Sequence, residues 1–292
     1  MHLWAHAISG LILEFHAYQG DRDSTIGCPS LFQSILNQNQ RISQVCPDCA
    51  TPTTNPRATQ APRLLITAGP TYEPIDAVRF VGNRSSGRLG SALADSAQDS
   101  GWKVTLLLGP NAVLPTNSDV EVVRFFSFLD LQSLLQTHWP QADTLIMAAA
   151  VADYRPVISP DDLGRKRKRE AGDFMLRLEP TPDLLAQCAH DARTNQLLIG
   201  FALEPKDGLI ASTKEKLRRK NIDLIVANAL ETMDSDSIEA TLLSNPDRGV
   251  PDQQSTPGLL SKAAFAQWLI AQITPLTHQR MGTPTGTTTN GR

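Results

Sequence analysis

Short apolar runs alternate with helical patterns through the middle of the chain. Residues 64–68 form a continuous apolar run, and residues 88–100 carry apolar side chains at helical spacing until Gly101. Further strands are expected at 104–108, 144–148, 174–178, 197–202, 224–227 and, at an edge, 241–243, and further helices at 129–138, 182–189, 209–219 and 262–273. Apolar strands that alternate with helices indicate a parallel sheet covered on both faces. We therefore predict an α/β fold with a doubly wound, mostly parallel, Rossmann-like sheet.

The two ends of the chain differ from this alternating middle. Residues 37–56 are rich in Gln, Asn, Thr, Pro and Ala, a composition that cannot bury a core. We predict a poorly ordered extension and linker over residues 1–62, one α/β domain over residues 63–275, and a disordered tail over residues 276–292.

Three of the four cysteines, Cys28, Cys46 and Cys49, lie in the N-terminal extension. A structural zinc ion takes four ligands, so the single CxxC pair would have to recruit Cys28 and a histidine. Free thiols and a zinc site both stay open for this segment. In the core domain, the sequence predicts no metal site built from side chains.

Charge and hydropathy limit the classes of partner. The net charge is −3, and no run approaches the roughly 18 apolar residues of a membrane span. No basic region precedes a long apolar stretch, as it would in a secretory signal. We expect a cytoplasmic protein that binds neither membranes nor nucleic acid.

The most informative loop is residues 83–90, which read NRSSGRLG. It follows the first strand and opens a helix, an arrangement that directs free N–H groups and the positive end of the helix dipole at an anion. Polar or small clusters also follow later strands, at residues 149–154, 200–204 and 228. Since ligands of such sheets bind at the carboxyl ends of the strands, these clusters should line one crevice.

Two basic clusters have open interpretations. Residues 166–169 (KRKR) form either a solvated loop or a clamp on a polyphosphate. Lys216 and Lys220 share one helix face, where they either stabilise the helix C-terminus or grip a polyphosphate. Between these clusters, Thr181 is expected to cap a helix that Pro182 and Asp183 begin.

Several motifs together carry a family resemblance. They are TAGPT (67–71), EPID (73–76), VRF (78–80), NRSSG (83–87), AAAVADYRP (148–156), KRKR (166–169), TPD (181–183), GFA (200–202), KLRRKN (216–221) and DLIVAN (223–228). In this order they closely resemble the phosphopantothenoylcysteine synthetase family, the phosphopantothenate–cysteine ligases of coenzyme A biosynthesis. In bacteria this enzyme is usually the C-terminal half of a bifunctional flavoprotein.

The resemblance implies a reaction in two steps. The carboxylate of 4′-phosphopantothenate attacks the α-phosphorus of a nucleoside triphosphate, which binds with Mg²⁺; the expected nucleotide is CTP, as in most bacteria, with ATP as the alternative. The amine of cysteine then attacks the acyl-nucleotidylate. Residues 1–62 are too few for the flavin-binding half, so we expect no flavin on this chain, a separate decarboxylase, and a homodimer.

The resemblance also assigns roles to residues. Asn83 and Lys166 match catalytic positions, the first as an amide donor to the acyl oxygen and the second as a charge at the leaving pyrophosphate. The matched nucleotide-binding positions are Ala149, Asp153, Lys166, Pro182, Asp183, Leu184, Leu185, Phe201, Lys216 and Lys220. Ser85, Ser86 and Gly87 are expected to hold the phosphate of phosphopantothenate.

Two rival functions lack their expected features. A Rossmann-type oxidoreductase would need a GxGxxG turn after the first strand and an acid after the second, where the chain instead reads LGP (108–110). A nucleic-acid binder would need aromatic side chains among its basic groups, and the aromatic content is only 5%.

Overall fold

A computed structural model of the chain describes residues 60–159, 163–168, 172–232, 235–250 and 254–282. Most of the N-terminal extension, with Cys28, Cys46 and Cys49, lies outside the described residues, as do Arg169 and residues 283–292. The expectations for these parts of the chain stay predictions.

An eight-stranded sheet forms the centre of the domain. Its strands are β1 (Arg63–Ala68), β4 (Lys103–Leu108), β5 (Glu121–Arg124), β6 (Thr144–Met147), β9 (Leu197–Glu204), β10 (Leu224–Ala229), β12 (Ala240–Ser244) and β13 (Gln254–Ser255). They lie in the order β13-β12-β10-β9-β6-β1-β4-β5, and all adjacent pairs from β10 to β5 are parallel. The prediction of a mostly parallel, Rossmann-like α/β fold is confirmed.

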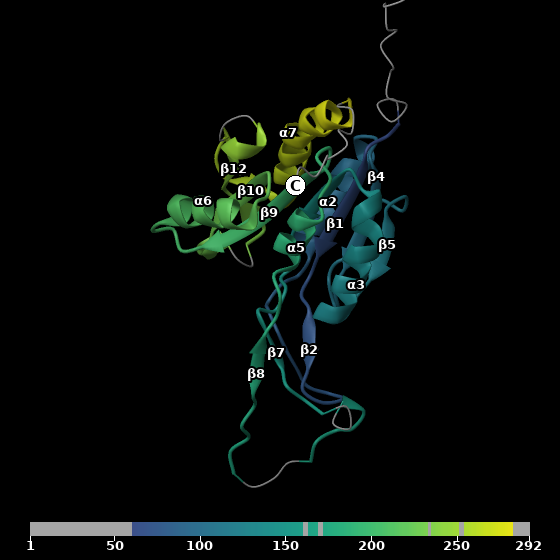
Figure 1. The fold of residues 1–292 in the computed structure, drawn as a ribbon, viewed down its shortest axis with the longest axis vertical. Coiled ribbons are helices and arrows are strands. Elements are labelled where there is room, and N and C mark those ends of the chain that lie inside the picture. Colours follow the sequence, from purple (N-terminus) through teal and green to yellow (C-terminus); the bar gives the residue numbers. More distant parts are fainter. Residues whose placement is uncertain (1–59, 160–162, 169–171, 233–234, 251–253, 283–292) are drawn as a thin grey trace, which may run out of the picture. The chain divides into compact units, whose positions relative to one another are not determined.

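Helices cover both faces of this sheet (Figure 1). Their bounds are Arg88–Asp99 (α2), Phe128–His138 (α3), Leu184–His190 (α5), Leu209–Lys220 (α6) and Lys262–Gly282 (α7), and short 3₁₀ turns occupy Trp139–Gln141, Leu230–Thr232 and Pro246–Arg248. α2 and α7 pack on one face, and α3, α5 and α6 pack on the other. The apolar run of β1 is buried on both sides as a result, which explains why it reads as continuous rather than alternating.

The C-terminal helix is longer than expected. The sequence predicted an end at Ile273 and a disordered tail from residue 276, but α7 continues to Gly282 with Pro275 inside it. A proline removes one helical hydrogen bond, so it normally marks a boundary. Here tertiary contacts outweigh that cost, because Thr277 is buried and its hydroxyl lies 2.8 Å from that of Thr144.

The last turn of α7 also completes a buried ionic network. Arg280 Nη2 donates to Asp223 Oδ1 over 2.7 Å, and Arg248 Nε donates to the same oxygen over 2.6 Å. The other oxygen of Asp223 accepts from the backbone N–H of Leu198 at 2.8 Å. Asp223 is fully buried, so these partners replace the water that its carboxylate loses.

Several short strands were not predicted. β2 (Tyr72–Pro74) pairs with β3 (Phe80–Gly82), β7 (Tyr154–Pro156) pairs with β8 (Leu178–Pro180), and β11 (Ser237–Ile238) pairs with β14 (Leu260–Ser261). Strands of two or three residues are too short to show a period in the sequence. We call β2, β3, β7 and β8, with the loops that join each pair, the arm, which extends from the sheet (Figure 1).

Two strand predictions need correction. The strand expected at 174–178 begins only at Leu178, because its pairing partner in the arm ends at Pro156. The strand expected at the sheet edge, 241–243, is covered by β13.

Candidate functional site

The site lies where the sheet reverses its winding direction. From β1 the chain continues outward through β4 and β5, and it then returns to the other side of β1 with β6. The loops that follow β1 and β6 therefore meet between these two strands, and a parallel bridge between Pro70 and Ala150 joins them. This switch point is where ligands of open α/β sheets bind.

A cavity of about 630 Å³ opens at this point. Its lining includes most of the residues that the resemblance assigns to the nucleotide: Ala149, Asp153, Pro182, Asp183, Leu184, Leu185, Phe201 and Lys220, together with Asn83. We call it the larger cavity. Six of its lining residues had not been assigned a ligand: Arg84, Met147, Ala150, Val151, Thr181 and Leu203.

A smaller cavity of about 270 Å³ adjoins it. Ser85, Ser86 and Gly87, expected at the phosphate of phosphopantothenate, line this one. The two cavities have Arg84, Ala149, Ala150, Phe201 and Leu203 in common. Ser237 and Lys262 also line the smaller cavity, and no sequence motif pointed to either.

Gly87 and Gly90 let the start of α2 approach the sheet. Gly87 is the N-cap with a φ of 68°, a left-handed conformation that favours glycine. At Gly90, a Cβ atom would lie only 2.2 Å from the Cβ of Ala68 in β1. α2 therefore begins directly against the end of β1, beside the smaller cavity.

Asn83 is fixed by the loop after β6. Its Nδ2 atom donates to the carbonyl oxygen of Val151 over 2.8 Å. The same loop is held by hydroxyls: Thr71 Oγ1 accepts from Ala152 N at 3.0 Å, and Thr181 Oγ1 donates to Ala152 O at 2.6 Å. The sequence had suggested that Thr181 caps the following helix. Its hydroxyl instead bonds to this loop.

Asp183 is the N-cap of α5 instead. Its side chain accepts from Ala186 N at 3.1 Å and forms an ion pair with Lys220 at 2.7 Å. Burial opposes ionisation of this carboxyl, but the hydrogen bonds from Lys220 and from the helix backbone outweigh it, so its pKa lies below the usual value. Lys220 therefore stands at the cavity wall already paired with an anion.

Lys216 does not line either cavity. It lies one turn before Lys220 on α6 and forms an ion pair with Glu204, which ends β9. Both lysines thus reach back to carboxylates near the strand ends. They share one helix face as predicted, but only Lys220 reaches the larger cavity.

Lys166 is also apart from the two cavities. It is exposed in the arm, in a segment bound to the β2–β3 turn, where Asp76 Oδ2 accepts from Arg167 N at 3.2 Å. The buried carboxylate of Asp76 further accepts from Val78 N and Arg79 N, both at 2.8 Å. The hydrogen bond from Val78, followed by those from Arg79 and Arg167, lowers the pKa of Asp76.

The model of the DNA/pantothenate metabolism flavoprotein C-terminal domain matches residues 59–276. The chain belongs to this family. The resemblance to phosphopantothenoylcysteine synthetases is therefore confirmed: the chain is homologous to the C-terminal part of the bifunctional proteins of coenzyme A biosynthesis.

Curated relatives differ in their names. A protein of an unknown prokaryote, called a cysteine/cysteine sulfinic acid decarboxylase, is 44% identical over 169 residues, which are 58% of this chain and 46% of that protein. The coenzyme A biosynthesis bifunctional protein CoaBC of Mycobacterium tuberculosis is 40% identical over 194 residues, 63% of this chain and 46% of that protein. The chain thus spans about half the length of the curated relatives it matches.

Solved structures agree on the fold. The C-terminal domain of CoaBC is 34% identical with a TM-score of 0.62, and the match covers 76% of this chain and 99% of that domain. A Cab2 mutant in complex with phosphopantothenate-cysteine is 17% identical with a TM-score of 0.61 over 87% of this chain and 95% of that one, a likeness that shows the fold alone.

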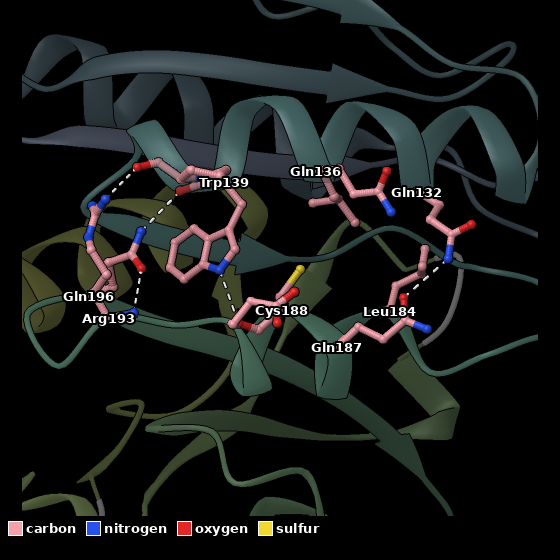
Figure 2. A pocket seen from close by; sticks show the side chains of 11 residues that line it. Gln132, Gln136, Trp139, Leu184, Gln187, Cys188, Arg193 and Gln196 are labelled. Carbon is pink, nitrogen blue, oxygen red and sulfur yellow. Dashed lines mark hydrogen bonds between the residues drawn. The ribbon is translucent and has the colours of Figure 1, made fainter. Parts of the chain in front are cut away.

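This family domain has a further cavity of about 300 Å³ between α3 and α5 (Figure 2). Two hydrogen bonds join its lining residues: Gln132 Nε2 donates to Gln187 Oε1 at 3.2 Å, and Trp139 Nε1 donates to Cys188 O at 3.0 Å. Burial raises the pKa of the Cys188 thiol to about 12, so it stays protonated. Leu184 alone among the site residues expected from the sequence lines it, so we assign it no part in the reaction.

Two searches of the described residues concern metals and membranes. Within them, three or more His, Cys, Asp or Glu side chains nowhere gather closely enough to hold a metal ion. Of the helices in the described part of the chain, each is too short or too polar to cross a bilayer.

Proposed function

We propose that the chain is a phosphopantothenate–cysteine ligase that uses CTP, with ATP as the alternative nucleotide, and acts in the cytoplasm. One observation supports this most directly. Most of the residues expected at the nucleotide line one cavity, the residues expected at phosphopantothenate line a second, and the two cavities adjoin. A carboxylate held in the smaller cavity could then attack a phosphorus atom held in the larger one.

The proposed reaction, which the family resemblance implies, has two displacements. The carboxylate oxygen bonds to the α-phosphorus of the triphosphate, and the bond to pyrophosphate breaks. The amine of cysteine then bonds to the acyl carbon, the nucleoside monophosphate leaves, and the amine loses one proton. The product is 4′-phosphopantothenoylcysteine.

Asn83 supports the acyl centre in this proposal. An amide nitrogen has two N–H donors, and Val151 O uses one of them. The second N–H can donate to the acyl oxygen as negative charge develops on it. The bond to Val151 would hold the amide in place without reorganisation during the reaction.

Charge near the triphosphate comes from Lys220, with Lys216 behind it on the same helix face. Asp183 and Glu204 neutralise these lysines in the structure, so a bound triphosphate competes with both carboxylates. Asp153 and Asp183 are the acids of the larger cavity, and Asp183 is already paired. Mg²⁺ would therefore enter bound to the nucleotide, which supplies most of its oxygen ligands.

We further propose that the enzyme is a homodimer. Much of the exposed apolar surface lies on the arm: Val78, Phe80, Tyr154, Val157, Phe174, Met175 and Leu178. Apolar side chains gathered in this way mark an interaction surface. A second subunit that covers the arm would also place the exposed Lys166 in a more enclosed environment.

Pyrophosphate release tests the ligase proposal. The assay supplies 4′-phosphopantothenate, L-cysteine, Mg²⁺ and one of the four common nucleoside triphosphates at a time. Release that depends on both phosphopantothenate and one nucleotide, with cysteine incorporated into the product, is the expected result. No release with any nucleotide would refute the proposal.

The decarboxylase name of one relative supplies the competing outcome. That relative is about twice as long as the matched region, and decarboxylation could belong to its other half. Carbon dioxide release from cysteine, cysteine sulfinate or phosphopantothenoylcysteine should be absent with this chain alone. We expect a separate decarboxylase to act on its product, without flavin on this chain.

A further inference from the structure

The smaller cavity is strongly basic. Arg84, Arg88 and Lys262 line it, and none of its lining residues is acidic. Arg88 is already paired, since its Nη1 atom lies 2.6 Å from Asp236 Oδ1. In contrast, none of the ion pairs found among the described residues involves Lys262. The cavity thus presents a lysine that forms no ion pair with another described residue.

Backbone pairing fixes the position of this lysine. β11 and β14 pair so that Ser237 lies opposite Ser261, and Lys262 follows directly. The backbone N–H of Lys262 donates to Asp236 O at 3.1 Å. From there α7 continues into the core, where Phe265 is fully buried. Lys262 is therefore held by a strand pair on one side and a packed helix on the other.

The placement of Lys262 is unfavourable for the helix itself. It is the first residue of α7, where the positive end of the helix dipole disfavours a cation. The first turn of α7 has no acidic residue to offset this. Across the same cavity, α2 has Gly87 as its N-cap and so has no side-chain cap. An anion in the cavity would offset the lysine charge and both helix ends.

We propose that Lys262 binds the phosphate monoester of 4′-phosphopantothenate, a role that rests on the proposed ligase function. Ser85 and Ser86 lie in the wall of the same cavity and supply hydroxyl donors. The ammonium of Lys262 supplies the positive charge that hydroxyls lack. It can donate a charge-assisted hydrogen bond to a phosphate dianion. The phosphate then anchors one end of the substrate, with its carboxylate toward the larger cavity.

The test compares Lys262→Met, which keeps the length and removes the charge, with Lys262→Arg, which keeps the charge. Lys103→Met is the control, because Lys103 begins β4 and so lies at the amino ends of the parallel strands, away from the two cavities. Each variant is assayed with 4′-phosphopantothenate and with pantothenate, which lacks the phosphate. Thermal unfolding confirms that each variant folds.

Loss of one charge-assisted hydrogen bond should lower kcat/KM for phosphopantothenate by about 10- to 100-fold in Lys262→Met. The values for pantothenate and the KM for the nucleotide should stay unchanged, and Lys262→Arg should recover part of the loss. Equal losses with both substrates, or no loss with either, would overturn the proposal.

The two proposals fail in different ways. If the unmodified protein releases no pyrophosphate, the ligase function fails. Titration calorimetry with inorganic phosphate and with phosphopantothenate then tests Lys262 by itself. Weaker binding by Lys262→Met than by Lys103→Met supports the anion site, and equal binding overturns it.

Discussion

Replacing Thr71 by valine should loosen the loop that holds Asn83. Thr71 is fully buried, and its hydroxyl accepts from Ala152 N at 3.0 Å and bonds to the Glu73 carboxyl. Valine has the same shape but cannot form either bond. The substitution thus isolates the hydroxyl from the packing of the side chain.

The expected magnitude follows from the two bonds. Ala152 is buried, so its N–H would lose its acceptor without access to water, at a cost of about 1–3 kcal/mol. The lost bond to Glu73 adds about 1 kcal/mol. The sum, about 2–4 kcal/mol, corresponds to a fall of roughly 5–15 °C in Tm for a domain of this size.

Thr71→Ser is the matched control. It keeps the hydroxyl and loses one methyl group, so it should cost only about 1 kcal/mol. Differential scanning calorimetry measures stability, and pyrophosphate release measures kcat below the transition. In Thr71→Val, kcat should also fall, because Val151 and the Asn83 amide lose a fixed position. If the valine and serine variants unfold at the same temperature with equal kcat, the hydroxyl does not hold the loop.

Three further predictions concern the same region. Asn83→Ala should lower kcat by about 10²- to 10³-fold, as for an oxyanion donor, while nucleotide affinity measured by calorimetry stays within a factor of three; lost affinity would assign Asn83 another role. Gly90→Ala places a methyl group against Ala68, so chemical denaturation should show a free energy of unfolding that is lower by about 1–3 kcal/mol. An unchanged free energy of unfolding would contradict the close approach. Burial raises the pKa of Glu73 despite hydrogen bonds from Phe128 and Thr71, so folding favours the neutral form of this carboxyl. The folded protein therefore loses stability as the pH rises through the pKa that Glu73 has in the folded state. Glu73→Gln removes this titration, and its stability relative to the unmodified protein should therefore increase from pH 4 to pH 8 or thereabouts; a parallel profile would show that Glu73 does not titrate in this window.

The sequence predicted the elements whose apolar residues form a clear local pattern. β1 and α2 were recognisable because one reads as an unbroken apolar run and the other repeats at helical spacing. The position of the site followed from the rule that clusters at strand ends meet. Most of the residues expected at the nucleotide do gather around one cavity, including Phe201 and Lys220 from distant elements.

Features that depend on tertiary contacts could not be predicted from the sequence. Lys262 enters the smaller cavity only because β11 and β14 pair, and neither two-residue strand has a pattern. The last turn of α7 forms despite Pro275 because Thr277 and Arg280 find buried partners far along the chain. Thr181 and Asp183 are both good caps by residue type, and only the structure distinguishes their roles.

The network around Asp223 has a consequence for synthesis of the protein. Until Arg280 leaves the ribosome, the Asp223 carboxylate lacks one of its cations, and breaking such a buried pair costs about 3–5 kcal/mol. The centre of the sheet therefore cannot reach full stability before the last turn of α7 has emerged, although most of its strands emerge earlier. Folding of this domain is completed only after its last helical turn is made, and in the meantime the nascent chain exposes apolar strands to chaperones.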